Sequence, residues 1–116
     1  MKINIDYDPE NDILYFYPNE KVVDFSIDYD DVILDISGNS VVGVEIMDAS
    51  IKFANENSEI ENIKKAIASI KEAYMNVKYG VNSIMVKIGF VSSVPEHSRE
   101  GLLIQIPIKR EMMLAV

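Results

Sequence analysis

The feature that most constrains the fold is a period-two alternation of apolar and polar residues that runs through the first half of the chain. Apolar side chains alternate with polar ones at Ile3, Ile5 and Tyr7, and again over residues 23–29. This pattern is typical of strands that bury one face. Turn-forming segments such as residues 8–11 and 37–40 separate the runs. We therefore predict an antiparallel meander of about five strands near residues 2–7, 12–17, 22–29, 32–36 and 41–48.

A helical pattern replaces this alternation after residue 50. Apolar residues recur at spacings of three and four from Ile60 to Val77, which favours one amphipathic helix. Ser58 and Glu61 have the spacing of a capping box, and Gly80 suits a helix C-terminus. Alternation returns over residues 84–90 and 102–108, which predicts two further antiparallel strands.

These patterns together predict an α+β fold in a single domain over residues 1–116. The meander occupies residues 2–50, and a helix with a β-hairpin extension occupies residues 51–116. The last strand contains Pro107, which cannot donate a backbone hydrogen bond and so favours an edge position or a bulge there.

The formal net charge of −8 is distributed unevenly along the chain. Residues 1–61 contain 15 Asp and Glu and three Lys, a charge of −12, whereas residues 62–116 carry a charge of +4. An acidic half is repelled by phosphate backbones, so a nucleic-acid partner is not expected. A small basic protein suits the acidic half better.

The composition excludes several kinds of site. The chain has no Cys and one His, which argues against a disulfide framework, a thiolate zinc site and a cysteine nucleophile. We expect no metal and no cofactor. No apolar run is long enough to cross a membrane, and the alternating, acidic N-terminus is unlike a signal peptide. The sequence therefore predicts a soluble cytoplasmic protein.

Two separated segments resemble one known family. The first reads Tyr7-Asp8-Pro9-Glu10-Asn11-Asp12-Ile13-Leu14-Tyr15. The second comprises residues 32–35, then Gly38, then Val41-Val42-Gly43-Val44-Glu45-Ile46-Met47-Asp48-Ala49-Ser50. Over residues 2–50 the chain resembles the domain of unknown function 2283 family. The resemblance implies no assigned activity, and because some members are encoded beside small toxin-like proteins it suggests an antitoxin role.

Several acidic groups are candidate sites. Asp6, Asp8, Glu10 and Asp12 alternate like early calcium-loop ligands, but the loop's glycine and final glutamate are missing, so we interpret this segment as a turn. A second group lies at Asp28, Asp30, Asp31 and Asp35, and solvated turn residues explain Asp30 and Asp31.

Three more carboxylates lie inside or beside apolar runs. Asp35, Glu45 and Asp48 need partners there, and backbone amides or a Lys from the second half are the simplest ones. They are candidate binding residues.

Residues 92–101 are the one stretch that mixes His, Arg, Glu and Ser. We interpret this stretch as a solvated loop, and His97 and Arg99 complete the candidate binding residues. His97 is where a general base would be sought, because its ordinary pKa lies near neutrality. However, the adjacent Ser98 would point away from it, so no nucleophile and base arrangement is visible, and no catalytic residue is assigned.

The leading functional hypothesis is a non-enzymatic binding or assembly module. One alternative is an antitoxin-like protein that neutralises a small toxin, and another is a hydrolase-type enzyme that uses the clustered carboxylates and His97. We also expect a homo-oligomer, most simply a dimer, because the chain ends in the apolar segment Met112-Met113-Leu114-Ala115-Val116.

Overall fold

The computed structural model describes residues 3–18 and 22–108, which form two antiparallel sheets and two α-helices. The first sheet has five strands in the order β1-β2-β5-β4-β3. Their bounds are β1 Asn4–Asp8, β2 Ile13–Tyr17, β3 Phe25–Tyr29, β4 Val32–Ser37 and β5 Ser40–Ile46. The second sheet has the order β6-β7-β8, with β6 Ile70–Tyr79, β7 Ile84–Ser92 and β8 Arg99–Ile106. The predicted α+β class is confirmed.

The five antiparallel strands do not follow one another across the sheet as a simple meander would. β1 and β2 form a hairpin at one edge, and β3, β4 and β5 form a three-stranded meander whose last strand pairs with β2. The apolar residues of β2 and β5 alternate with the same phase, because Leu14 lies opposite Ile46 and Phe16 opposite Val44. This register buries one face of both strands.

The second half differs from the sequence prediction in where its helix ends. After the short helix α1 (Ala49–Phe53), helix α2 covers only Ile60–Ala68. The expected capping box does not form, since Glu59 is the N-cap residue and the Ser58 hydroxyl accepts a hydrogen bond from the amide of Asn55. Gly80 lies in the turn between β6 and β7, where its amide donates to the carbonyl of Ser83.

The predicted C-terminal half of the helix is instead strand β6, so three strands follow α2 rather than two. Ala73, Met75, Val77 and Tyr79 are partly buried and pack against the core, whereas Asn76 and Lys78 between them are exposed. Pairing with β7 along almost its whole length satisfies the backbone of this segment. Tertiary pairing therefore outweighs the helical spacing of the apolar residues.

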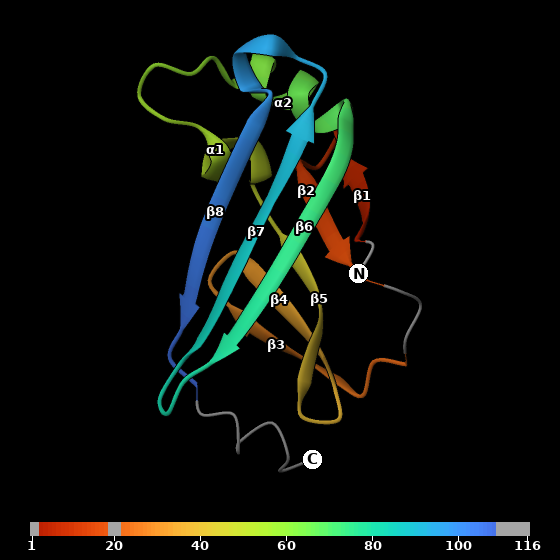
Figure 1. Ribbon diagram of the computed structural model, residues 1–116, viewed down its shortest axis with the longest axis vertical. Helices are drawn as coiled ribbons and strands as arrows, with labels where there is room; N and C mark the ends of the chain where they lie inside the picture. The colour runs from red at the N-terminus through yellow and green to blue at the C-terminus, as the bar shows by residue number, and fades with distance from the viewer. Residues whose placement is uncertain (1–2, 19–21, 109–116) are drawn as a thin grey trace.

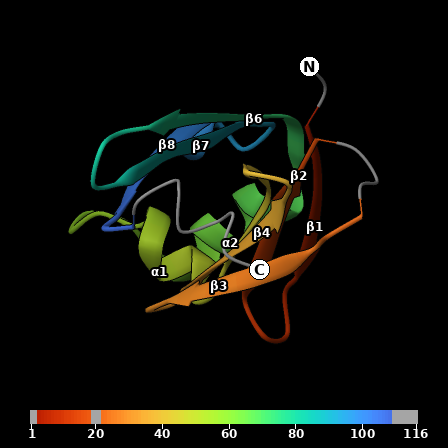
Figure 2. The same cartoon turned by 90° about the horizontal axis from the view of Figure 1, so that it is seen from below.

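The core lies between the inner faces of the two sheets. Leu14, Phe16 and Leu34 of the first sheet and Ile88 and Phe90 of the second are completely buried in one cluster. Figures 1 and 2 show the sheets as two layers whose strands cross, with both helices at one end of the space between them. Ile63, Ala66 and Ile67 of α2 join the same cluster. The outer faces of the sheets consequently point away from each other.

Turn chemistry agrees with the sequence at the first hairpin. The Asp8 carboxylate accepts hydrogen bonds from the amides of Glu10 and Asn11, as expected for an Asx-type turn. Gly38 has a φ of 63° in the turn between β4 and β5, a conformation that glycine adopts readily.

The ends of the second sheet give two more outcomes. β8 is an edge strand, as predicted, but it ends at Ile106 and so does not contain Pro107. The apolar tail on which the dimer prediction rests, residues 112–116, lies outside the described residues. Among the helices that the structure describes, none is long and apolar enough to cross a membrane.

Candidate functional site

The outer face of the five-stranded sheet carries a row of side chains that crosses all five strands. Each neighbouring pair in this row is in register: Asp6, Tyr15, Glu45, Ile33 and Asp28. Asp8 and Asp35 project from the same face, because they lie two residues from Asp6 and Ile33. We call this surface, with its carboxylates Asp6, Asp8, Asp28, Asp35 and Glu45, the acidic face. The described strands β1–β5 contain no Lys, Arg or His.

Hydroxyl groups satisfy the carboxylate at the centre of the acidic face. The Tyr15 hydroxyl donates to Oδ2 of Asp35 over 2.5 Å, and the Ser26 hydroxyl donates to Oδ1 over 2.7 Å. Gly43 pairs with Asp35 and makes room for this contact, since a Cβ there would lie 2.6 Å from the Tyr15 hydroxyl oxygen. The predicted need for a partner is met by hydroxyls rather than by backbone amides or Lys.

A cavity of about 380 Å³ opens on this surface. It is lined by two apolar or aromatic residues and four carboxylates: Ile13, Tyr15, Asp6, Asp8, Asp35 and Glu45. Burial raises the pKa of the Tyr15 hydroxyl, and the hydrogen bond to Asp35 and the charge of Glu45 raise it further. Tyr15 therefore stays protonated at neutral pH and acts as a hydrogen-bond donor rather than a base.

The structure distributes the five predicted binding residues over four places. Asp35 and Glu45 lie together in the acidic cavity. Asp48 is exposed, has a φ of 52° and precedes α1, where its carbonyl accepts from the amides of Ile51 and Lys52. Arg99 is exposed at the start of β8.

His97 lies apart from the acidic face. It is 9% exposed in a 3-10 turn (Pro95–His97), and its Nδ1 lies 3.1 Å from Oε1 of Glu100. The stretch predicted as a solvated loop is thus ordered by this turn and by a hydrogen bond from the amide of Ser92 to the carbonyl of Ser98. His97 lines a second cavity with residues of the α1–α2 connection such as Asn57 and Ser58. The structure does not bring His97 to Asp35 or Glu45.

Asp12 is the residue whose role the sequence analysis missed. It follows the turn carboxylates Asp8 and Glu10 in the sequence, yet it is 9% exposed and has a φ of 56°. Its carboxylate accepts from the hydroxyls of Tyr7 and Ser50 at 2.7 and 2.6 Å and from the amide of Ser50. Asp12 thereby ties the first hairpin to α1. Asp12 belongs to the first segment that carries the family resemblance and Ser50 to the second. This shared membership is the feature of the sequence that could have indicated their contact.

Within the described ranges, no group of three or more His, Cys, Asp and Glu residues is arranged to hold a metal ion. The carboxylates of the acidic face are spread along strands rather than converging on one point. The arrangement suits long-range attraction of positive charge better than coordination of an ion.

The acidic face lies in the part of the chain that matches a known protein family. Residues 4–50 match the family described as "Protein of unknown function (DUF2283)". The resemblance predicted over residues 2–50 is thereby confirmed. All five carboxylates of the acidic face fall within the matched residues, whereas the second sheet falls outside them.

Two curated archaeal relatives match parts of the chain. A protein of Methanosarcina mazei named "Putative hypoxanthine phosphoribosyltransferase" is 39% identical over 74 residues, covering 63% of this chain and 60% of the relative. An uncharacterized protein of Methanocaldococcus jannaschii is 44% identical over 54 residues, covering 46% of this chain and 47% of the relative. The match thus spans about half of each relative. No solved structure matches the chain significantly.

Proposed function

We propose that this protein is a non-enzymatic binding module that uses its acidic face to bind a basic surface on a partner protein. The observation that carries the proposal is the charge of the five-stranded sheet. Five carboxylates project from its outer face, and the described strands of this sheet hold no cationic side chain to neutralise them. Such a field attracts a basic partner and accelerates its association.

The chemistry of the acidic cavity supports binding over catalysis. Tyr15 is held protonated, and Asp35 is already occupied by two hydroxyl donors. A general base needs a free acceptor near the substrate proton. His97, where a general base would be sought, lies beside Glu100 in a separate cavity. These placements disfavour the hydrolase hypothesis.

The phosphoribosyltransferase name of the Methanosarcina mazei relative is a weak guide to this chain. A phosphoribosyl group carries negative charge, and binding it requires N–H donors or cations. The acidic cavity presents four carboxylates instead, which repel phosphate. We therefore do not extend phosphoribosyl transfer to this protein.

A small basic protein is the class of partner that this proposal favours. That class includes the toxin-like partner suggested by the family resemblance, and the antitoxin role stays a hypothesis of this kind. A cytoplasmic location and a single folding unit over residues 1–116 are part of the proposal. The shared core of the two sheets supports the single unit.

The test uses a labelled basic peptide of ten alternating Lys and Ala residues and the full chain. Fluorescence anisotropy should detect binding that weakens several-fold between about 50 mM and about 300 mM NaCl. The triple variant Asp6→Asn, Asp28→Asn, Glu45→Gln should lose at least about ten-fold in affinity, because it removes three carboxylates of the acidic face.

The matched control neutralises exposed carboxylates elsewhere. Glu56, Glu59 and Glu96 lie at the helical end of the molecule and are exposed. Glu56→Gln with Glu59→Gln and Glu96→Gln removes as many charges as the triple variant and should leave the affinity within about two-fold. Equal losses in both variants would mean that net charge alone attracts the peptide. That result, or no binding to the wild type, would overturn the proposal.

A further inference from the structure

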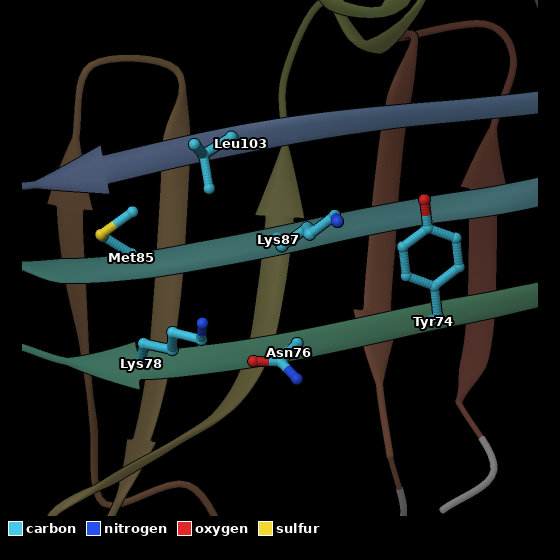
Figure 3. A pocket seen from close by; sticks show the side chains of 6 residues that line it. All are labelled: Tyr74, Asn76, Lys78, Met85, Lys87 and Leu103. Atoms are coloured by element: carbon cyan, nitrogen blue, oxygen red, sulfur yellow. The ribbon is translucent and has the colours of Figure 1, made fainter.

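The outer face of the three-stranded sheet is a second exposed surface, and it differs in character from the acidic face. Three neighbouring rows cross its strands in register: Tyr74, Gly89 and Gly101; Asn76, Lys87 and Leu103; Lys78, Met85 and Gln105. Figure 3 shows six of these side chains on the side of the sheet that faces away from the first sheet. They line a cavity of about 320 Å³.

Tyr74 and two glycines shape one end of this surface. A Cβ on Gly89 would lie 2.2 Å from the Tyr74 hydroxyl oxygen, and a Cβ on Gly101 would lie 3.0 Å from it. The Tyr74 side chain therefore lies across β7 toward β8 instead of standing upright. Beyond it, Leu103 is 60% exposed and Met85 is partly exposed. Tyr74, Met85 and Leu103 thus form the apolar part of this surface.

The charges of this surface are mainly positive. Lys78 and Lys87 line the cavity, and Arg99 projects from the same face because it pairs with Val91, two residues from Gly89. Glu72, which also pairs with Val91, is the carboxylate in that row. The cationic side chains are exposed, and none of them forms an ion pair within the described chain. We call this surface the basic face.

We propose that the basic face of one copy of this protein binds the acidic face of a second copy. The inference rests on the proposed function, because it names a partner for the acidic face. Complementary potentials orient such an encounter. The two faces lie on opposite outer sides of the molecule, as Figure 2 shows. The contact is therefore head-to-tail and leaves one free face at each end of the assembly.

Charge argues against the alternative in which two basic faces meet. That pairing would place Lys78, Lys87 and Arg99 of both copies in one interface and cost free energy through like-charge repulsion. Pairing two acidic faces would likewise cost free energy, because their carboxylates would repel one another.

The size of the basic face indicates a weak contact. Three strands spaced about 4.8 Å apart and about eight residues long present roughly 400 Å², about half of what a stable interface buries on each partner. We therefore expect reversible association that is detected at high concentration and low salt, and not a permanent oligomer.

The experiment is sedimentation velocity on the full chain from about 10 µM to about 500 µM. The average mass of the wild type should rise with concentration at about 50 mM NaCl and return to the monomer at about 500 mM. Two charge-reversed variants, K78E/K87E on the basic face and D6K/D28K on the acidic face, should each remain monomeric. All four side chains are exposed, so both variants should fold, which circular dichroism checks.

Mixing the two variants gives the decisive result. The K78E/K87E variant keeps an intact acidic face and the D6K/D28K variant keeps an intact basic face. An equimolar mixture should form a one-to-one heterodimer that does not grow further, because the faces left over are both altered. The control K64E/K65E makes the same charge change on α2 and should associate as the wild type does.

Several outcomes would overturn the inference. These are a wild type that stays monomeric at every concentration, association that K78E/K87E leaves intact, and variants that fail to pair when mixed. If the wild type is monomeric but the basic peptide binds through the acidic face, the self-association fails and the proposed function stands. If neither binds, both fail.

Discussion

At the residue scale, similar carboxylates have different roles because their surroundings differ. Asp12 is buried and accepts three hydrogen bonds from Tyr7 and Ser50, whereas Asp30 lies exposed in a turn with a φ of 52°. The sequence shows both as Asp beside a turn. It could predict the Asx turn at Asp8, which depends on neighbours, but not the role of Asp12, whose partner Ser50 is 38 residues away.

Replacing Asp12 should therefore cost far more than replacing Asp30. Asp12→Ala leaves the buried donors of Ser50 unsatisfied and should lower the free energy of unfolding by about 3 kcal/mol. Asp30→Asn should change it by less than about 0.5 kcal/mol, because Asn also tolerates a positive φ. Urea denaturation of the two variants measures both values. Equal and small effects would contradict the role assigned to Asp12.

Two tyrosines should make the protein sensitive to alkali. Burial raises the pKa of the Tyr7 and Tyr15 hydroxyls, and their hydrogen bonds to Asp12 and Asp35 raise it further. In the unfolded chain they titrate at the ordinary pKa of about 10. Their contribution to stability is therefore complete below about pH 10 and is lost as the pH rises above it.

The measurement is tyrosine ionisation followed by ultraviolet absorbance. Of the six tyrosines, Tyr7 and Tyr15 should ionise only when the protein unfolds at high pH. Tyr7→Phe with Tyr15→Phe should abolish this delayed phase, and Tyr29→Phe, at a side chain that is 38% exposed, should leave it unchanged. Titration of all six groups near pH 10 in the folded protein would refute the expected delay.

At the element scale, alternation predicted strands well and the helix boundary poorly. Residues 60–77 carry both a three-four spacing and, from Ala73, a period-two spacing, so the pattern alone cannot separate helix from strand. Helix α2 ends at Ala68 with Ser69 as its C-cap, and no Gly or Pro marks this end. Residues 70–79 form a strand because they pair with β7. That partner lies later in the sequence, so the local pattern of residues 60–77 does not reveal it.

Two glycines that admit tyrosine side chains give a prediction at this scale. Gly43→Ala and Gly89→Ala should each destabilise the protein by more than about 1 kcal/mol, because a Cβ would overlap Tyr15 or Tyr74 respectively. Removing the tyrosine should reduce the destabilisation caused by Gly43→Ala but not the destabilisation caused by Gly89→Ala. A Cβ on Gly43 meets side chains alone, whereas one on Gly89 also lies 2.6 Å from the backbone oxygen of Glu100.

A double-mutant cycle measures this difference. Gly43→Ala should be less costly in Tyr15→Ala than in the wild type, and Gly89→Ala should remain costly in Tyr74→Ala. Equal rescue at both sites would mean that β7 and β8 separate easily, in conflict with their continuous pairing.

At the scale of the whole molecule, the sheet that carries the acidic face cannot bury its inner side by itself. The sequence predicted the acidic half and its resemblance to a family, but not the surface that covers the inner side of its strands. That cover is the second sheet together with α2, whose side chains complete the buried cluster. Residues far apart in the sequence pack together in this cluster, and the composition of the chain does not specify which faces of the two sheets pack against each other.

The family-like segment should therefore not fold alone. In a fragment of residues 1–54, Phe16, Leu34 and Ile46, all completely buried in the full chain, would be exposed to water, and each buried side chain of this kind contributes about 2 kcal/mol. The fragment should give a nuclear magnetic resonance spectrum of an unfolded or aggregated chain. The full chain should unfold in one cooperative step. In native-state hydrogen exchange, the slowest amides of β5 and of β7 should therefore give the same free energy of opening. A dispersed spectrum for the fragment, or separate transitions for the two sheets, would mean that the acidic face belongs to an autonomous domain and that residues 55–116 only stabilise it.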